Sequence, residues 1–158
     1  TVIREGLEKT HYALNDVIIR NRDAKVVHLK LSVGDNFVEK FYGDGIIIAS
    51  SAGSTGYNYS LGGCIVDPRL EVLQLTPFAP INNQVFRSFT SSLLFPSSQE
   101  IKISPLGDPD ENSGVYCDGE VFCTGKADTV TVSLSERVIN IVRSLDYDFW
   151  NKVQSKFL

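Results

Sequence analysis

The chain has 158 residues, of which 42% are hydrophobic and 22% are charged, and its formal net charge is -4. A chain of this length folds as about one domain and buries on the order of 70% of its unfolded surface. The composition excludes a disordered segment, a collagen and a coiled coil. No apolar run approaches the ~18 residues that a membrane span needs, and the mild acidity argues against nucleic acid as a partner.

The cysteine and histidine content narrows the chemistry further. Three cysteines without zinc-site spacing indicate a reducing compartment, and we expect a cytoplasmic protein. Only two histidines are present, which argues against a histidine-based metal site. The chain begins at Thr1 and has no methionine, so we expect it to be a piece of a longer protein.

Hydrophobic residues alternate with a period of two along most of the chain. Val27, Leu29 and Leu31 alternate with polar residues, which is typical of a half-buried strand. Residues 129–134 repeat this pattern, and residues 138–142, with interleaved valine and isoleucine, predict a strand covered on both faces. Further short strands are predicted over residues 14–20, 36–41, 46–49, 71–75, 100–104, 116–117 and 120–123.

Helix signals are sparse. A short helix is expected over residues 54–61, and a C-terminal helix over residues 148–157, which opens with an acidic turn and spaces Trp150, Val153 and Phe157 by three and four. Residues 105–114 are predicted to form a polar loop rather than a domain linker. The expected fold is therefore mainly β: a single domain over residues 1–158, built as a β-sandwich of many short strands.

A glycine- and serine-rich segment stands out at residues 43–63, which hold six of the twelve glycines. The segment predicts a strand, a loop, a short helix and a Gly-Gly stop. Glycines let a backbone approach a ligand closely, and Ser54 and Thr55 are suitable helix caps or hydroxyl donors. An ordinary flexible loop with a helix cap fits the composition equally well. No Gly-Lys-Ser/Thr follows, so the segment is not a P-loop.

Taken as an ordered string, the same segment resembles the second-domain signature of the NAD kinase family. That signature runs Asp-Gly, an apolar strand, Ser-Thr-Pro-Thr-Gly-Ser-Thr-Ala-Tyr and a Gly-Gly pair. The matching residues are Asp44, Gly45, Gly53, Ser54, Thr55, Tyr57, Ser60, Gly62 and Gly63. Residues 13–17 (ALNDV) resemble the family's Ala-Leu-Asn-Glu-Val block, residues 75–80 (LTPFAP) its Leu-Thr-Pro-x-x-Pro block, and residues 118–119 its Asp-Gly turn. The terminal FWNKV suits Gram-positive-type members.

The resemblance implies a function that the chain performs only in part. Family members phosphorylate the adenosine 2′-hydroxyl of NAD to give NADP, using ATP or polyphosphate with a divalent metal such as Mg²⁺. Their N-terminal domain carries a Gly-Gly-Asp-Gly motif that this chain lacks. The resemblance therefore implies an NAD-binding and oligomerisation domain that is inactive alone, holds no catalytic residue or metal itself, and meets ATP or polyphosphate through the missing domain. It also implies a homodimer or homotetramer.

The resemblance also implies a set of NAD-binding residues: Asn15, Asp16, Asp44, Ala52, Thr55, Gly56, Tyr57, Asn58, Ser60, Ala79, Ile81, Phe86 and Asp118. Those from 52 to 60 match the part of the signature that contacts adenine and ribose, whereas Ala79, Ile81 and Phe86 would wall the nicotinamide pocket.

Each role has a plain alternative. Asn15 and Asp16 suit base or ribose hydrogen bonds, but they equally suit the polar start of a strand. Asp44 and Asp118 precede glycines and would form turns in any case. By resemblance, Asp44 is expected near the nicotinamide carboxamide, from its own subunit or across a subunit interface, and Asp118 is expected to line the same region near the catalytic centre. The apolar residues equally suit an ordinary core.

Departures from the signature leave other functions open. Ser50-Ser51-Ala52 stands where the family has Thr-Pro-Thr, Gly56 replaces alanine, and Tyr42 stands where many members have a basic residue. The alternatives are a related two-domain lipid or sugar kinase, a non-enzymatic β-sandwich binding module with an exposed aromatic platform, and a purely structural oligomerisation domain. A measurement of NAD affinity distinguishes these alternatives from an NAD kinase domain.

Overall fold

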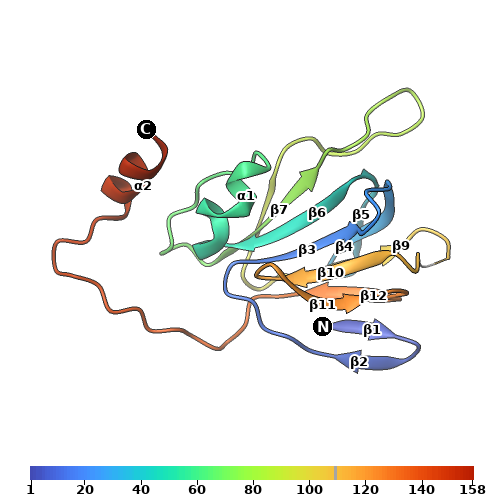
Figure 1. Ribbon diagram of the computed structural model, residues 1–158, viewed down its shortest axis with the longest axis horizontal. Helices are drawn as coiled ribbons and strands as arrows, with labels where there is room; N and C mark the ends of the chain where they lie inside the picture. Colours follow the sequence, from blue (N-terminus) through green and yellow to red (C-terminus); the bar gives the residue numbers. More distant parts are fainter. Residues whose placement is uncertain (109) are drawn as a thin grey trace.

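The computed structural model describes residues 1–108 and 110–158 and consists of two antiparallel six-stranded sheets packed face to face (Figure 1). The first sheet has the order β2-β1-β12-β9-β4-β5, with β1 Val2–Arg4, β2 Leu7–Lys9, β4 Val27–Val33, β5 Asn36–Gly43, β9 Ile101–Pro105 and β12 Thr129–Val132. The second has the order β11-β10-β3-β6-β7-β8, with β3 Asp16–Asn21, β6 Gly45–Ser50, β7 Val72–Phe78, β8 Leu93–Pro96, β10 Ser113–Cys117 and β11 Glu120–Thr124. The predicted β-sandwich is confirmed.

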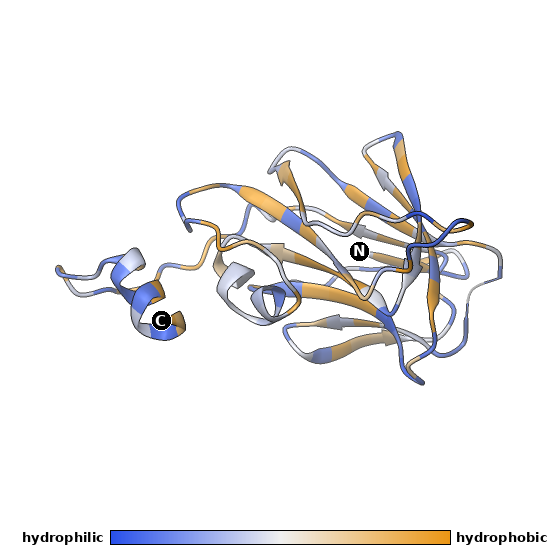
Figure 2. Cartoon of the chain, turned by 90° about the horizontal axis from the view of Figure 1, so that it is seen from above, coloured by the Kyte–Doolittle hydropathy of each residue, from blue (hydrophilic) through white to orange (hydrophobic). Residues whose placement is uncertain are grey.

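The core lies between the sheets, where the period-two pattern places alternate side chains. Val27, Leu29 and Leu31 of β4 are buried, whereas His28 and Lys30 between them are exposed. Figure 2 shows the same alternation of hydrophobic and hydrophilic residues along the strands. Strand β6 differs because Ile46–Ala49 are all buried: η1 (Ala52–Thr55) and α1 (Tyr57–Ser60) lie against this strand.

Both predicted helical segments are present. The 54–61 prediction corresponds to η1 and α1, and the C-terminal helix α2 spans Phe149–Phe157. Helix α2 begins where predicted because the Asp148 carboxylate caps it, accepting the Asn151 N–H at 2.7 Å. The helix returns to the sandwich beside α1, where the rings of Phe157 and Tyr59 lie 4.4 Å apart. Figure 1 shows the long connection that leads to it.

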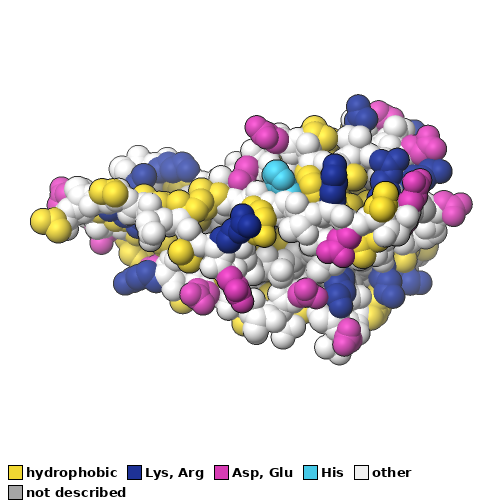
Figure 3. Space-filling model, turned by 90° about the horizontal axis from the view of Figure 1, so that it is seen from below, with side chains coloured by type: hydrophobic (Ala, Val, Ile, Leu, Met, Phe, Trp, Pro, Cys, Tyr) yellow, Lys and Arg dark blue, Asp and Glu magenta, His cyan; other side chains and the backbone are white. Residues whose placement is uncertain are grey.

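The strand predicted over residues 138–142 is wrong. In the structure these residues belong to no strand, and their side chains are exposed, from 59% at Ile141 to 98% at Val142. A strand needs a hydrogen-bonded neighbour, and no strand within residues 1–108 and 110–158 pairs with this segment. Figure 3 shows hydrophobic side chains on the surface of the extended part that protrudes from the sandwich.

Three short strands were not predicted. Strands β1 and β2, of three residues each, form a hairpin whose turn residues Glu5 and Gly6 both adopt positive φ. Charged residues in both strands obscure the alternation of apolar and polar positions. Strand β8 carries the apolar run Leu93–Pro96 at the edge of the second sheet. Three residues are too few for a period to show, and the run of β8 does not alternate between apolar and polar residues.

The remaining sequence predictions concern loops and chemistry. The polar connection predicted over 105–114 runs from the end of β9 to the start of β10, and its Pro109 lies outside the described residues. The three cysteines are free thiols. Among the described helices, none is both long enough and apolar enough to traverse a bilayer.

Candidate functional site

The turn that precedes β3 is held by one carboxylate from the end of the neighbouring strand, β10. Asp118, in the β10–β11 turn, accepts the backbone N–H groups of Leu14 at 2.7 Å, Asn15 at 2.7 Å and Asp16 at 3.1 Å. In return, the Asp118 N–H donates to the Asp16 carbonyl oxygen at 3.1 Å. Asp118 adopts a positive φ of 50°, which aspartate tolerates better than most residues. The predicted ligand residues 15, 16 and 118 thus form one unit.

The loop after β6 closes on the same turn. The Ser50 N–H donates to the Asn15 carbonyl oxygen at 2.9 Å, and the Ser50 hydroxyl donates to the Leu14 carbonyl oxygen at 2.7 Å. A Cβ atom on Gly53 would lie 2.1 Å from the Asn15 carbonyl oxygen. Only glycine therefore allows this loop to reach the turn, which explains the glycine of the matched signature at this position.

A cavity of about 390 Å³ opens beside this unit, between the ends of the two sheets. Its lining includes Asn15, Asp16 and Ser50, with Phe122 and Cys117 among the other residues. Asp16 is only 7% exposed and is one of the residues that line this space. Burial, and secondarily the charge of Asp118, raises the pKa of the Asp16 carboxyl. The site therefore offers a desolvated hydrogen-bond acceptor to a ligand with hydroxyl groups.

Cys117 is the buried thiol of this cavity. Burial, with the nearby charge of Asp118, raises its pKa to about 11. The thiol is therefore neutral at physiological pH and acts as a small apolar residue rather than a nucleophile.

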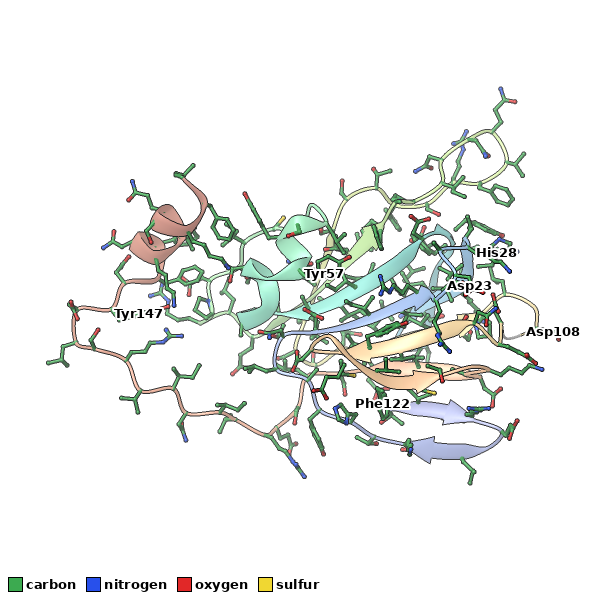
Figure 4. All side chains as sticks on the ribbon, in the orientation of Figure 1. Asp23, His28, Tyr57, Asp108, Phe122 and Tyr147 are labelled. Atoms are coloured by element: carbon green, nitrogen blue, oxygen red, sulfur yellow. The ribbon has the colours of Figure 1, made fainter. Side chains whose placement is uncertain are left out.

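The segment from η1 to α1 presents most of the other predicted residues to solvent. Ala52, Gly56, Tyr57 and Ser60 are exposed, and Thr55 is half-buried. Figure 4 shows Tyr57 on α1, at the end of the sandwich from which α2 is reached. These side chains are therefore free to contact a ligand.

Asn58 differs from its neighbours because it is fully buried. Its Oδ1 accepts the Thr76 hydroxyl at 2.7 Å, and its Nδ2 donates to the Ser54 carbonyl oxygen at 3.4 Å. These contacts tie α1 to β7, so the structure gives Asn58 a role in holding the segment. Its contact with NAD stays a prediction.

The predicted residues Asp44, Ala79, Ile81 and Phe86 lie elsewhere. Asp44 is exposed between β5 and β6, and the other three belong to the β7–β8 connection. The six-residue strand β6 separates Asp44 from the turn at its other end, a length of about 20 Å. In Figure 4, Tyr57 and His28 mark these opposite ends of the sandwich. We name the two groups the Asn15 end (residues 13–16, 50–60 and 118) and the Asp44 end (residue 44 and residues 79–92).

Two residues near these ends were missed by the sequence analysis. Lys156 of α2 donates from Nζ to the Thr55 carbonyl oxygen at 2.7 Å, and no local pattern predicts this contact across 101 residues. Glu39 of β5 is buried at 8% exposure, although its residue type is usually exposed. The sequence could have predicted the burial of Glu39, because it lies two residues before the core residue Phe41 and therefore on the same face of the strand.

Comparison with known families agrees with this arrangement. The family model described as ATP-NAD kinase C-terminal domain matches residues 14–144, which include both ends of the site. The chain belongs to the ATP-NAD kinase C-terminal domain family. The match covers most of the chain, so the NAD kinase resemblance is confirmed and the lipid or sugar kinase alternative is not supported.

Curated relatives bear NAD kinase names and come mostly from Gram-positive bacteria. The NAD kinase 2 of Halalkalibacterium halodurans is 33% identical over 151 residues, which cover 96% of this chain and 57% of that protein. The NAD kinase of Finegoldia magna is 35% identical over 161 residues, covering 100% of this chain and 59% of that protein. The chain thus spans somewhat more than half the length of these relatives.

Solved structures share the fold. An NAD kinase from Archaeoglobus fulgidus in complex with ATP superimposes with a TM-score of 0.60 at 31% identity, over 76% of this chain and 45% of that chain. Yeast NADH kinase complexed with NADH gives a TM-score of 0.63 at 24% identity, over 74% of this chain and 33% of that chain. The β-sandwich of this family is therefore the fold of the present chain.

Proposed function

We propose that this chain is the NAD-binding and oligomerisation domain of an NAD kinase, whose full-length form converts NAD to NADP. The observation that carries the proposal is the Asn15 end: a turn fixed by Asp118 through three amide hydrogen bonds, beside a cavity whose lining includes Asn15 and the buried residue Asp16. Membership of the family and the NAD kinase names of the relatives support the same assignment.

The residues of the Asn15 end have chemistry suited to the adenosine half of NAD. The Asp16 carboxylate accepts hydrogen bonds from ribose hydroxyls, and the Asn15 amide both donates and accepts at a ribose or base edge. The exposed ring of Tyr57 stacks on adenine, and Thr55 and Ser60 supply hydroxyl groups beside it. Ala52 and Gly56 leave room for the close approach of the nucleotide because they lack bulky side chains.

The distance between the Asn15 end and the Asp44 end leads us to propose that NAD binds between two copies of the chain. Asp44, Ala79 and Ile81 are proposed to contact the nicotinamide half of NAD, yet about 20 Å of β6 separates Asp44 from the Asn15 end. A second copy of the chain that brings its Asp44 end against the Asn15 end of the first completes the site. We therefore propose a homo-oligomer, a dimer or a tetramer, with NAD bound between copies.

The chemistry of phosphoryl transfer is proposed to lie outside this chain. The divalent metal of the family, Mg²⁺ by expectation, is usually held by one or two carboxylates together with the phosphates of a substrate. Residues 1–108 and 110–158 contain no group of three histidine, cysteine or acidic side chains able to hold an ion, so we propose that the metal enters with the phosphate donor. ATP or polyphosphate would be bound by the part of the protein that corresponds to the relatives' unmatched length, in a cytoplasmic enzyme.

Calorimetric titration with NAD tests the proposal. Tyr59 lies on the same short helix as Tyr57 and is also 42% exposed, but its ring packs against Phe157 of α2 and it is not among the predicted NAD-binding residues. Tyr59→Ala therefore controls for the loss of a tyrosine ring from α1. We expect saturable binding that Asn15→Ala and Tyr57→Ala each weaken about ten-fold and that Tyr59→Ala leaves within about two-fold. Absence of NAD binding by a folded, oligomeric chain would contradict the proposal. Substantial NADP formation by this chain from NAD, ATP and Mg²⁺ would contradict the separate expectation that the chain is inactive alone.

A further inference from the structure

Glu39 is a carboxylate on the inner side of an edge strand. In β5 it shares its face with Phe41, which is 1% exposed and belongs to the core. Strand β5 is the last strand of the first sheet, so its outer edge has no strand neighbour in the described structure. The β7–β8 connection covers Glu39 instead, because residue 89 of that connection reaches its carboxylate.

The two oxygens of Glu39 have different environments. Oε2 accepts the Phe89 N–H at 3.0 Å. Oε1 is buried without a hydrogen-bond partner among the described residues. Burial raises the pKa of this carboxyl, and the Phe89 N–H opposes the shift only in part. A leucine of similar size would avoid this desolvation, so the bond to Phe89 is what the carboxylate contributes here.

The rest of the connection is attached to β5 at a single residue, Tyr42. The Ile81 N–H donates to the Tyr42 carbonyl oxygen at 2.7 Å, and the Tyr42 N–H donates to the Ser88 hydroxyl at 3.2 Å. Between these points the tip holds itself together, because Asn82 bonds to the backbone of Ser88 in both directions, at 2.8 and 3.1 Å. The returning half of the connection is also held by the ring of Phe86, 4.2 Å from that of Tyr42, and by the Ser92 hydroxyl, 2.8 Å from that of Thr76. The Glu39–Phe89 bond is therefore one of several anchors of this half, and the one made by a buried carboxylate.

The outgoing half is under strain at Ala79. This residue adopts a φ of 43°, a conformation costly for a side chain with a Cβ. The backbone there also presses on β5, because a Cβ on Gly43 would lie 2.9 Å from the carbonyl oxygens of both Phe78 and Ala79. Such a conformation persists only where surrounding contacts hold it, so the position of Ala79 and Ile81 depends on the anchors of the connection.

We propose that Glu39 is a positioning residue of the NAD site: it anchors residues 79–92 to β5 and so sets Ala79 and Ile81 in the conformation that meets NAD. The proposal rests on the proposed function for the role of those two residues, but the anchoring itself rests on the contacts above. Glu39 does not touch the ligand, and it acts through the connection.

Two variants of similar size test the anchor. Glu39→Gln keeps an acceptor for the Phe89 N–H, whereas Glu39→Leu removes it. Glu8→Gln, an exposed carboxylate on β2, is the control for the loss of one charge. Hydrogen exchange of the amides in residues 79–92 and calorimetric titration with NAD are measured on each variant and on the unaltered chain.

We expect Glu39→Leu to speed exchange in residues 79–92 about ten-fold and to weaken NAD binding about five- to ten-fold. Glu39→Gln and Glu8→Gln are expected to stay within about two-fold of the unaltered chain. Unchanged exchange in Glu39→Leu overturns the proposal, as does faster exchange with unchanged NAD affinity. If the unaltered chain binds no NAD, the proposed function fails separately, and the exchange data still decide whether Glu39 holds the connection.

Discussion

At both ends of the sandwich, a carboxylate accepts backbone N–H groups and holds a loop, but one carboxylate is exposed and the other is buried. At the Asn15 end, the exposed carboxylate of Asp118 accepts three backbone N–H groups and uses both of its oxygens. At the Asp44 end, the carboxylate of Glu39 is 8% exposed, accepts one N–H and leaves its other oxygen unpaired. An exposed carboxylate loses little hydration when it fixes a turn, whereas a buried one loses much of it.

This difference indicates how each end functions. At the Asn15 end, the backbone N–H groups of residues 14–16 find their acceptor within the same chain, so the turn is fixed before the proposed ligand arrives. The Asp44 end combines an unpaired buried oxygen, a strained Ala79 and the exposed side chains of Val85 and Phe89, at 80% and 45% exposure. Such an end gains more from contact with another copy than the Asn15 end does, which is consistent with a site completed between copies.

The largest effect is expected from Gly53→Ala, which attacks the Asn15 end at its closest approach. The added Cβ would lie 2.1 Å from the Asn15 carbonyl oxygen, and backbone cannot move aside as a flexible side chain can. We expect a loss of about 3 kcal/mol in the free energy of unfolding, measured by urea denaturation. Gly56→Ala is the control, because its nearest contact is 3.2 Å and its effect should stay within about 1 kcal/mol. Equal effects of both variants would contradict the account.

Asp118→Ala is expected to follow. It leaves the amides of residues 14–16 without their acceptor, so we expect unfolding to become about 2 kcal/mol easier and NAD affinity to fall by more than ten-fold. Asp118→Asn keeps one acceptor oxygen and should recover part of both losses. If Asp118→Ala lowers NAD affinity without any change in stability or in exchange of these amides, Asp118 contacts the ligand rather than the turn.

Asn58→Ala tests whether Asn58 stabilises the fold of the Asn15 end or contacts NAD. Its buried amide bonds to Thr76 and Ser54, so we expect a stability loss of about 1–2 kcal/mol. The NAD affinity of the folded fraction should change by less than about three-fold, as measured by calorimetry well below the unfolding temperature. A large loss of affinity with unchanged stability would instead assign Asn58 to the ligand.

The smallest effect concerns Asp16 and pH. Its pKa is raised above the ordinary 3.8 in the folded state, so the folded chain holds this proton more tightly than the unfolded chain does. Its contribution to stability is therefore fully present below pH 3.8 and is lost as the pH rises through the folded-state pKa. Asp16→Asn should remove this slope and be more stable at pH 7 by about 1 kcal/mol, with weaker NAD binding. Urea denaturation between pH 4 and 7 measures it, and a steeper slope in the variant would contradict the prediction.

Much of the sandwich follows from the sequence because its strands alternate in a regular way. Strand β4 was predicted from its alternation, and β6 was recognised from its apolar run. The strand predicted over residues 138–142 was wrong for a physical reason: a pattern reports that side chains favour burial on two faces, but not whether a neighbouring strand exists. Short strands such as β2 escape detection because three residues show no period.

The NAD-binding residues stay predictions, and their arrangement in space did not follow from the sequence. Local motifs named Asn15, Asp44 and Asp118, yet nothing in them indicates that β6 separates Asp44 from the other two. The contacts that hold the site, such as Lys156 to Thr55 and Glu39 to Phe89, join residues 50 or more positions apart. Such pairings depend on the tertiary fold, and a single sequence does not record them.

The claim that the two ends complete one NAD site between copies is tested most directly by complementation. Asp118→Ala disables the Asn15 end, and Asp44→Ala disables the Asp44 end. Each variant alone should bind NAD weakly, but an equal mixture, unfolded and refolded together, should regain strong binding at about a quarter of the sites through random pairing of copies. A mixture that binds NAD no better than either variant alone would contradict the account.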